Sequence, residues 1–165
     1  DLDIGHFRPR DPEAVQHELL RQQQVAVVRR GHALAHGRLT AARYAAAQHV
    51  GVSRRVGAAS PVDDALTALG LARDVALSVP QANVSALIAA RSDLVATLSE
   101  RVAEAMAATL GLQVLKLAFA TAPEVMVMAW HPRQAADPAH ACLRQSFLQL
   151  LAASRHGPEP AQAGA

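Results

Sequence analysis

The feature that most constrains this chain is the alternation of short β-branched or aliphatic runs with helical patterns. The runs fall at residues 49–53, 75–79, 94–98, 114–117 and 125–129. Helical patterns separate the first four runs, at residues 60–70, 83–91 and 99–111, and a last helix is expected to begin at Asp137-Pro138. Strands that alternate with helices in this way form a parallel sheet with right-handed crossovers, so the sequence predicts an α/β fold.

The helix at residues 60–70 has clear start and stop signals. Ser60 is a favourable N-cap, and Gly70 ends the pattern. The spacing of Val62, Leu66 and Leu69 predicts one apolar stripe that faces the core. The same reasoning predicts the inward residues of the later helices: Val84, Leu87 and Ile88; Val102, Met106 and Leu110; Leu143, Phe147, Leu150 and Leu151.

The segment before residue 49 has weaker signals. Ile4-Gly5 is typical of a strand end, residues 25–28 predict a longer strand, and residues 39–46 predict a short helix. The stretch from Arg155 is rich in Pro, Gly, Ala and Gln, and residues 156–165 are therefore expected to form a disordered tail.

Composition limits the classes of function. Half of the residues are apolar and only 3% are aromatic, which favours a packed aliphatic core. Lys and Arg are spread along the chain, so no basic stripe for nucleic acid is expected. No apolar run is long enough to cross a membrane, and the first residues lack the charged start and apolar run of a signal peptide. The single cysteine, Cys142, excludes an intrachain disulfide and is interpreted as a small core residue.

Catalytic and metal-binding patterns are absent from the sequence. It contains no nucleophile elbow, no phosphate-binding glycine loop and no H-E-x-x-H motif. His32 and His36 lie four residues apart, but their glycine-rich surroundings favour exposed loop histidines over metal ligands. Asp63 and Asp64 are adjacent, and their place in a first helical turn favours interaction with the helix dipole over acid–base chemistry. We therefore expect no cofactor, no metal and no catalytic residue.

Several stretches, taken in order, carry a family resemblance. They are DLDIGHF at 1–7, QVAVVRRGHALA at 24–35, HVGVS at 49–53, PVDDALTALGL at 61–71, DLVATLS at 93–99, AWHP at 129–132 and DPAH at 137–140. In this order and spacing the sequence resembles the effector-binding domain of LysR-type transcription regulators, in the branch of nodulation and naphthalene regulators.

This resemblance implies a two-lobed fold like that of type 2 periplasmic binding proteins, with mixed, mostly parallel sheets. Lobe I would contain residues 1–33 and 120–155, and lobe II residues 34–119. The crossovers between the lobes would lie near residues 31–35 and 118–123. The winged helix-turn-helix that binds DNA in the family is expected to be absent here, as are the first strand and helix of the sensing domain, which leaves lobe I incomplete.

Ligands of open α/β sheets bind beyond the carboxyl ends of the strands, where helix N-termini attract anions. This rule selects six candidate residues for effector binding: His6, Phe7, Ser53, Gln81, Asn83 and Trp130. Alternatives remain open for most of them. Asn83 also suits an N-cap and Ser53 a turn, while Phe7 and Trp130 also suit a core or a lobe interface.

The resemblance further implies the kind of effector and partner. Relatives in this branch respond to small aromatic acids or flavonoids, which Phe7 and Trp130 could stack against while Gln81 and Asn83 hold a carboxylate or phenol. Arg54 or Arg55 could add a charge, although a surface role is favoured. The expected protein is a cytoplasmic, non-enzymatic regulator that forms a homodimer or tetramer when full-length, with DNA bound only through the absent domain. The alternative is a stand-alone solute-binding protein of the same fold.

Overall fold

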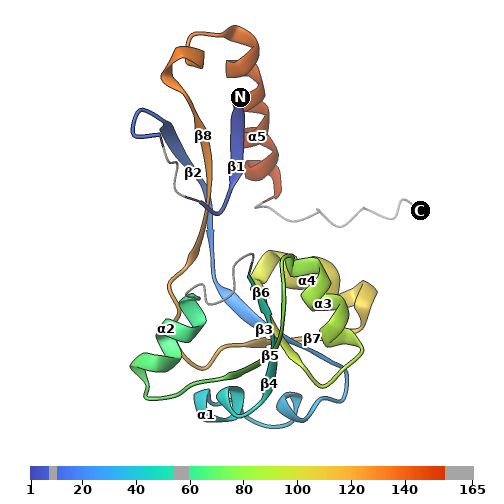
Figure 1. The fold of residues 1–165 in the computed structure, drawn as a ribbon. Helices are drawn as coiled ribbons and strands as arrows, with labels where there is room; N and C mark the ends of the chain where they lie inside the picture. The colour runs from blue at the N-terminus through green and yellow to red at the C-terminus, as the bar shows by residue number, and fades with distance from the viewer. Residues whose placement is uncertain (8–10, 54–59, 155–165) are drawn as a thin grey trace, which may run out of the picture. The chain divides into compact units, whose positions relative to one another are not determined.

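The computed structural model describes residues 1–7, 11–53 and 60–154. The chain divides into two compact units, each with its own sheet (Figure 1). Unit 1 contains Asp1–Arg21 and Val125–Ala165, and unit 2 contains Gln22–Glu124. The predictions for Arg54, Arg55 and the 156–165 tail lie outside the described residues.

Unit 2 has a five-stranded sheet in the order β5-β4-β6-β3-β7. The strands are β3 (Gln24–Arg29), β4 (Gln48–Val52), β5 (Asp74–Val79), β6 (Val95–Ser99) and β7 (Leu112–Lys116). Strand β4 pairs in parallel with β5 and β6, whereas β3 pairs antiparallel with β6 and β7. Every strand of this sheet except β3 therefore runs in one direction, and the predicted mixed, mostly parallel sheet is confirmed for unit 2.

Helices cover both faces of this sheet because β3 is apolar on both of its sides. Val25 and Val27 pack in a cluster with α3 (Ala82–Ala90) and α4 (Glu100–Leu110). Ala26 and Val28 point to the opposite face and pack in a cluster with α1 (Ala41–Ala45) and α2 (Pro61–Ala68). Successive side chains of a strand alternate between faces, so this one strand contributes to two cores.

The predicted ends of α2 are confirmed, but the inward positions predicted for Leu69 in this helix and for Leu87 in α3 are wrong. Ser60 caps α2 by accepting a hydrogen bond from the Val62 N–H at 3.3 Å. Leu69 is 53% exposed because it follows the last helical turn with non-helical dihedral angles and leaves the stripe. Leu87 is 46% exposed because small residues of α3, among them Ala86 and Ala89, form the face that approaches the sheet.

Unit 1 has a three-stranded sheet in the order β1-β8-β2, with one long helix, α5 (Pro138–Ser154). Its strands are β1 (Leu2–Gly5), β2 (Val15–Gln22) and β8 (Glu124–Trp130), and β1 pairs antiparallel with β8. Sequence patterns missed β2, because its residues are mostly polar and exposed and only Leu19 and Leu20 are buried.

Helix α5 differs from its predicted amphipathic pattern. Leu143 and Leu150 were expected to face the core, but they are exposed by 47% and 67%. Cys142 is also exposed and is not a core residue. The small sheet of unit 1 offers little apolar surface, so a 17-residue helix buries only part of its apolar side chains.

The predicted division after residue 33 is also wrong. Strand β3 was assigned to lobe I, but its backbone pairs on both edges with strands of unit 2. The first boundary therefore falls between Arg21 and Gln22, and the second falls between Glu124 and Val125, about five residues later than the predicted one.

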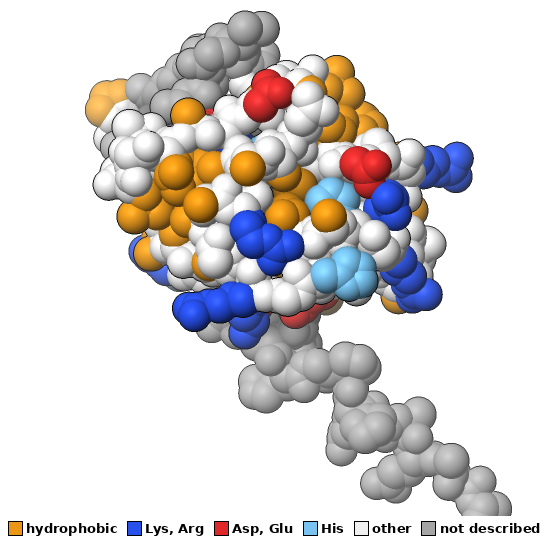
Figure 2. Space-filling model, turned by 90° about the horizontal axis from the view of Figure 1, so that it is seen from below, with side chains coloured by type: hydrophobic (Ala, Val, Ile, Leu, Met, Phe, Trp, Pro, Cys, Tyr) orange, Lys and Arg blue, Asp and Glu red, His pale blue; other side chains and the backbone are white. Residues whose placement is uncertain are grey.

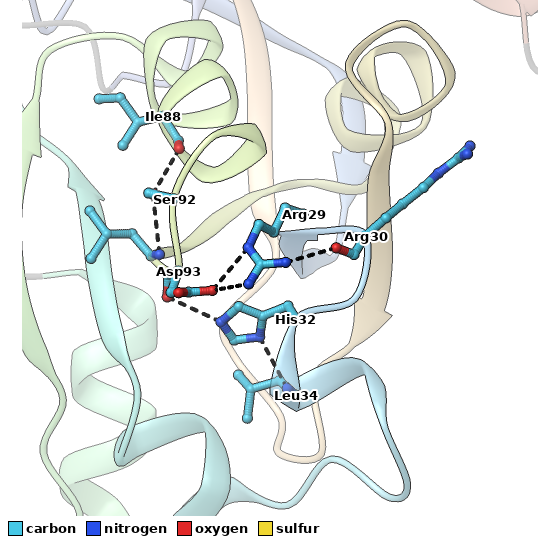
Figure 3. A network of polar contacts seen from close by, with 8 residues as sticks. Arg29, Arg30, His32, Leu34, Ile88, Ser92 and Asp93 are labelled. Atoms are coloured by element: carbon cyan, nitrogen blue, oxygen red, sulfur yellow. Dashed lines mark hydrogen bonds and ion pairs between the residues drawn. The ribbon is translucent and has the colours of Figure 1, made fainter.

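The turn after β3 is held by a polar network around Asp93 (Figure 3). Arg29 donates from Nε and Nη2 to Asp93 Oδ1 at 2.9 and 2.6 Å. His32 Nδ1 accepts from the Leu34 N–H at 3.0 Å, so Nε2 carries the proton and donates to the Asp93 carbonyl at 3.1 Å. His32 is thus a buried turn residue, which corrects the exposed assignment, whereas His36 is exposed as expected.

Helix α2 offers a matched test of the core. We expect Leu66→Ala to lower the free energy of unfolding by about 2–5 kcal/mol, because Leu66 is fully buried and truncation leaves a cavity. Leu69→Ala removes the same atoms from an exposed position and should cost less than about 1 kcal/mol. Urea unfolding measures both, and equal losses would contradict the assigned helix face.

Candidate functional site

The carboxyl edge of the parallel strands in unit 2 gathers two of the six candidate residues. Val52 and Val79 are register partners at the ends of β4 and β5. The Ser53 N–H donates to the Val79 carbonyl at 2.9 Å, which places Ser53 next to the segment that leads to Gln81. Strands that end together bring their following residues to one edge, as the sequence predicted for these two positions.

Gln81 and Asn83 lie at the N-terminus of α3. Gln81 is the N-cap residue, in extended conformation, and its side chain forms no capping hydrogen bond. Asn83 lies inside the first turn, where its Oδ1 accepts from the Val84 N–H at 3.0 Å, so the alternative of Asn83 as N-cap is wrong. Both side chains are exposed. This helix start therefore presents two amide side chains and uncapped N–H groups to a ligand.

The remaining three candidates belong to unit 1, and two of them share a pocket of about 490 Å³. Phe7 and Trp130 both line it, together with Asp1, Asp3 and Asp11. The Arg144 guanidinium lies 4.7 Å from the Trp130 ring centroid, and the buried Trp130 Nε1 has no hydrogen-bond partner among the described residues. His6 does not line this pocket; its Nδ1 donates to the Val125 carbonyl at 3.1 Å.

Sequence analysis missed a second group of residues at the sheet edge of unit 2. A pocket of about 280 Å³ lies where β3 begins, β7 ends and α4 begins. Its lining includes Gln24, Glu100, Lys116 and Phe119. Lys116 is the one lysine of the chain, and Glu100 lies two residues after the end of a predicted strand, so these two signals were available in the sequence.

A second polar cluster in unit 2 surrounds the buried Tyr44. The Tyr44 hydroxyl lies 2.6 Å from Thr97 Oγ1 and accepts from Arg73 Nη1 at 3.3 Å. Arg73 also donates to both carboxylate oxygens of Asp63, at 2.7 and 3.2 Å. Burial raises the pKa of Tyr44. Burial works against the charge of Arg73, but the hydrogen bonds and charges of Asp63 and Tyr44 together outweigh it and raise the pKa of Arg73. Asp63 therefore serves structure, in the first turn of α2.

His49 belongs to the same cluster, and its pKa is strongly shifted. Its Nε2 donates to the Tyr44 carbonyl at 2.9 Å, and its ring centroid lies 4.5 Å from that of Tyr44. Its Nδ1 is buried and has no hydrogen-bond partner in the described part of the chain. Burial lowers the pKa of His49 to about 4, so the imidazole is neutral at pH 7. A fully buried neutral histidine of this kind packs the core.

Charge and metal-binding groups give no other site. On the face shown in Figure 2, Lys and Arg side chains are separated by apolar and neutral surface and form no continuous stripe. Within residues 1–7, 11–53 and 60–154, no cluster of three or more His, Cys, Asp or Glu side chains could hold a metal ion. None of the helices in these ranges is long and apolar enough to cross a membrane.

Comparison with known proteins decides the family. The profile of the LysR substrate binding domain matches residues 1–152. The chain belongs to the LysR substrate-binding domain family. The transcriptional activator NahR of Pseudomonas putida is 30% identical over 152 residues, which cover 92% of this chain and 50% of NahR. The chain thus spans about half the length of this curated relative.

Solved structures of LysR-family domains share the fold. The regulatory domain of MexT, a transcriptional activator of Pseudomonas aeruginosa, is 29% identical, with a TM-score of 0.77 over 91% of this chain and 72% of that one. The effector-binding domain of QuiR in complex with shikimate has a TM-score of 0.75 over 93% of this chain and 73% of its own. At 15% identity, the likeness to QuiR shows the fold alone.

The shifted pKa of His49 predicts a pH dependence of stability. The unfolded chain binds a proton at His49 near pH 6.5, whereas the folded chain binds one only near pH 4. The unfolded state therefore holds more protons between these values, and stability falls as the pH is lowered through this window, by at most about 3 kcal/mol. His49→Phe should remove this part of the slope in urea unfolding measured from pH 7 to pH 4. If the variant shows the same pH dependence of the unfolding free energy as the unaltered chain, folding does not lower the pKa of His49.

Proposed function

We propose that this chain is the effector-sensing domain of a bacterial transcription regulator. It binds a small molecule and thereby controls DNA binding by a separate domain of the full-length protein. The observation that carries this proposal is the carboxyl edge of the sheet in unit 2. There the Gln81 side chain forms no capping hydrogen bond at the start of α3. Family membership and the regulators NahR and MexT support the same role.

Taken separately, the candidate residues of each unit offer chemistry that suits an effector with an acidic or phenolic group. In unit 2, Gln81, Asn83 and the N–H groups of α3 supply donors for an oxygen anion, with Ser53 beside them. In unit 1, Phe7 and Trp130 offer aromatic surface for a ring, and His6 lies at the end of β1. The shikimate in the QuiR structure is a small organic acid, which supports an effector of this size.

The proposed regulator acts by a shift between states. An effector that binds one arrangement of the domain better than another changes the populations of the two, and the DNA-binding part of the regulator responds. We further propose that the full-length protein is a cytoplasmic homodimer or tetramer with no enzymatic activity.

The proposal predicts a ligand-dependent melting temperature. Small aromatic carboxylates, phenols and flavonoids should be screened, and one class should raise the melting temperature saturably, because ligands stabilise the folded state they bind. Gln81→Ala should reduce the shift, with an affinity loss of about tenfold for one lost hydrogen bond to a charged group. Gln113→Ala is the control. It changes an exposed glutamine near the start of β7, and it should keep the full shift in melting temperature. If the protein melts cooperatively and no compound shifts its melting temperature, an effector of these classes is contradicted.

A further inference from the structure

The pocket between β3, β7 and α4 lies wholly within unit 2 and shares no residue with the Gln81 region. It measures about 280 Å³. Its lining residues are Gln23, Gln24, Val25, Glu100, Lys116, Leu117, Phe119 and Thr121. These combine one cation, one anion, uncharged polar groups and an apolar wall, and each kind of group constrains what the pocket can bind.

The two charged side chains of the pocket have no ion-pair or hydrogen-bond partner among the described residues. No ion pair joins Lys116 to Glu100, and neither side chain forms a hydrogen bond with any residue in the described ranges. Glu100 is the first residue of α4 and complements the helix dipole there, which explains a carboxylate at this position but not its lack of a partner. Two opposite charges that line one pocket without pairing are suited to a ligand that carries both charges, separated in space.

Gln24, which also lines the pocket, has a side-chain oxygen that accepts no hydrogen bond from the described residues. Its Oε1 is buried and has no partner among the described residues. A buried amide oxygen without a donor is unfavourable, and most such atoms in folded proteins are satisfied. A ligand would reach this enclosed oxygen only after the Gln24 side chain turns toward the pocket, whereas Glu100 attracts a ligand ammonium without such a change.

Phe119 provides a fixed apolar surface. Its ring meets that of Tyr44 edge-to-face with centroids 5.3 Å apart, and Tyr44 is itself fully buried. Leu117 and Val25 line the same pocket. The Phe119 ring is thus held in place by the core and can contact an apolar side chain of a ligand.

We propose that this pocket binds the zwitterion of an α-amino acid. The ligand carboxylate pairs with Lys116, the ammonium pairs with Glu100, and the side chain packs against Phe119. This is a second binding site, and it does not depend on the role proposed for the Gln81 region.

Three related probes test the charge requirement on the unaltered chain. L-Phenylalanine carries both charges, 3-phenylpropanoate lacks the ammonium, and 2-phenylethylamine lacks the carboxylate. Isothermal titration calorimetry should show saturable binding of L-phenylalanine, with each analogue at least about tenfold weaker, because each loses a charge-assisted hydrogen bond. L-Leucine with 4-methylpentanoate repeats the comparison for an aliphatic side chain.

Variants assign the effect to this pocket. Lys116→Met should weaken L-phenylalanine binding about tenfold or more, and Lys116→Arg should retain most of it. Glu100→Gln should weaken L-phenylalanine but not 3-phenylpropanoate. Glu104→Gln, at an exposed position of the same helix, should leave L-phenylalanine binding unchanged.

Two outcomes overturn the proposal. If 4-methylpentanoate, which has no ring and lies outside the classes proposed for the Gln81 region, binds as tightly as L-leucine, the pocket recognises a plain acid. If neither amino acid binds at concentrations on the order of 10 mM, the pocket takes no such ligand. Both outcomes leave the sensing role open, since that role is tested by the melting shift that Gln81→Ala weakens. The probe comparison requires no variant, so it holds even if Glu100→Gln fails to fold.

Discussion

The structure of unit 2 depends on the complete burial of β3. Val25 to Val28 are nearly or fully inaccessible, and their alternate side chains enter the two helix layers. The backbone of β3 is hydrogen-bonded on both sides, to β6 and β7. Because β3 alone runs against the other strands, its start lies at the same edge as the ends of β6 and β7. That reversal brings Gln24, at the start of β3, beside Lys116 and Glu100.

The elements that the sequence predicts well are those with strong local signals. The strands and helices between residues 49 and 117 were predicted within a few residues, since β-branched runs, N-caps and glycine ends recur there. Sequence patterns failed where tertiary contacts decide the outcome. Strand β2 has little apolar periodicity. Strand β3 follows the first segment of unit 1 in sequence, but the strands that pair with it belong to unit 2. Burial in α3 is set by Ala86 and Ala89, which let the helix approach the sheet, and periodicity alone favoured the larger Leu87.

The candidate site was only partly predictable for a related reason. The rule that ligands lie beyond parallel strands finds Ser53 and Gln81, because both follow strands of one sheet. The rule gives no information on β3, whose direction is not encoded in its own sequence. Gln24, Lys116 and Glu100 are far apart along the chain and become neighbours only through the antiparallel pairing of β3. Phe7 and Trp130 were both expected to stack on one effector ring, and in the structure the two line one pocket of unit 1.

The two edges of the unit 2 sheet differ in how far their polar groups are satisfied. At the edge where β3 ends, Asp93 accepts from Arg29 and His32, while Gly70 and Gly111 adopt positive φ angles that close α2 and α4. The opposite edge is left open. Gln81 and Ser99 form no side-chain capping bonds. The buried Gln24 Oε1 has no partner among the described residues. Folding alone would favour satisfied groups at both edges. The unmet groups at this edge lie where α/β sheets bind ligands, so a bound ligand would supply their missing partners, whereas the unpartnered His49 Nδ1 is enclosed in the core.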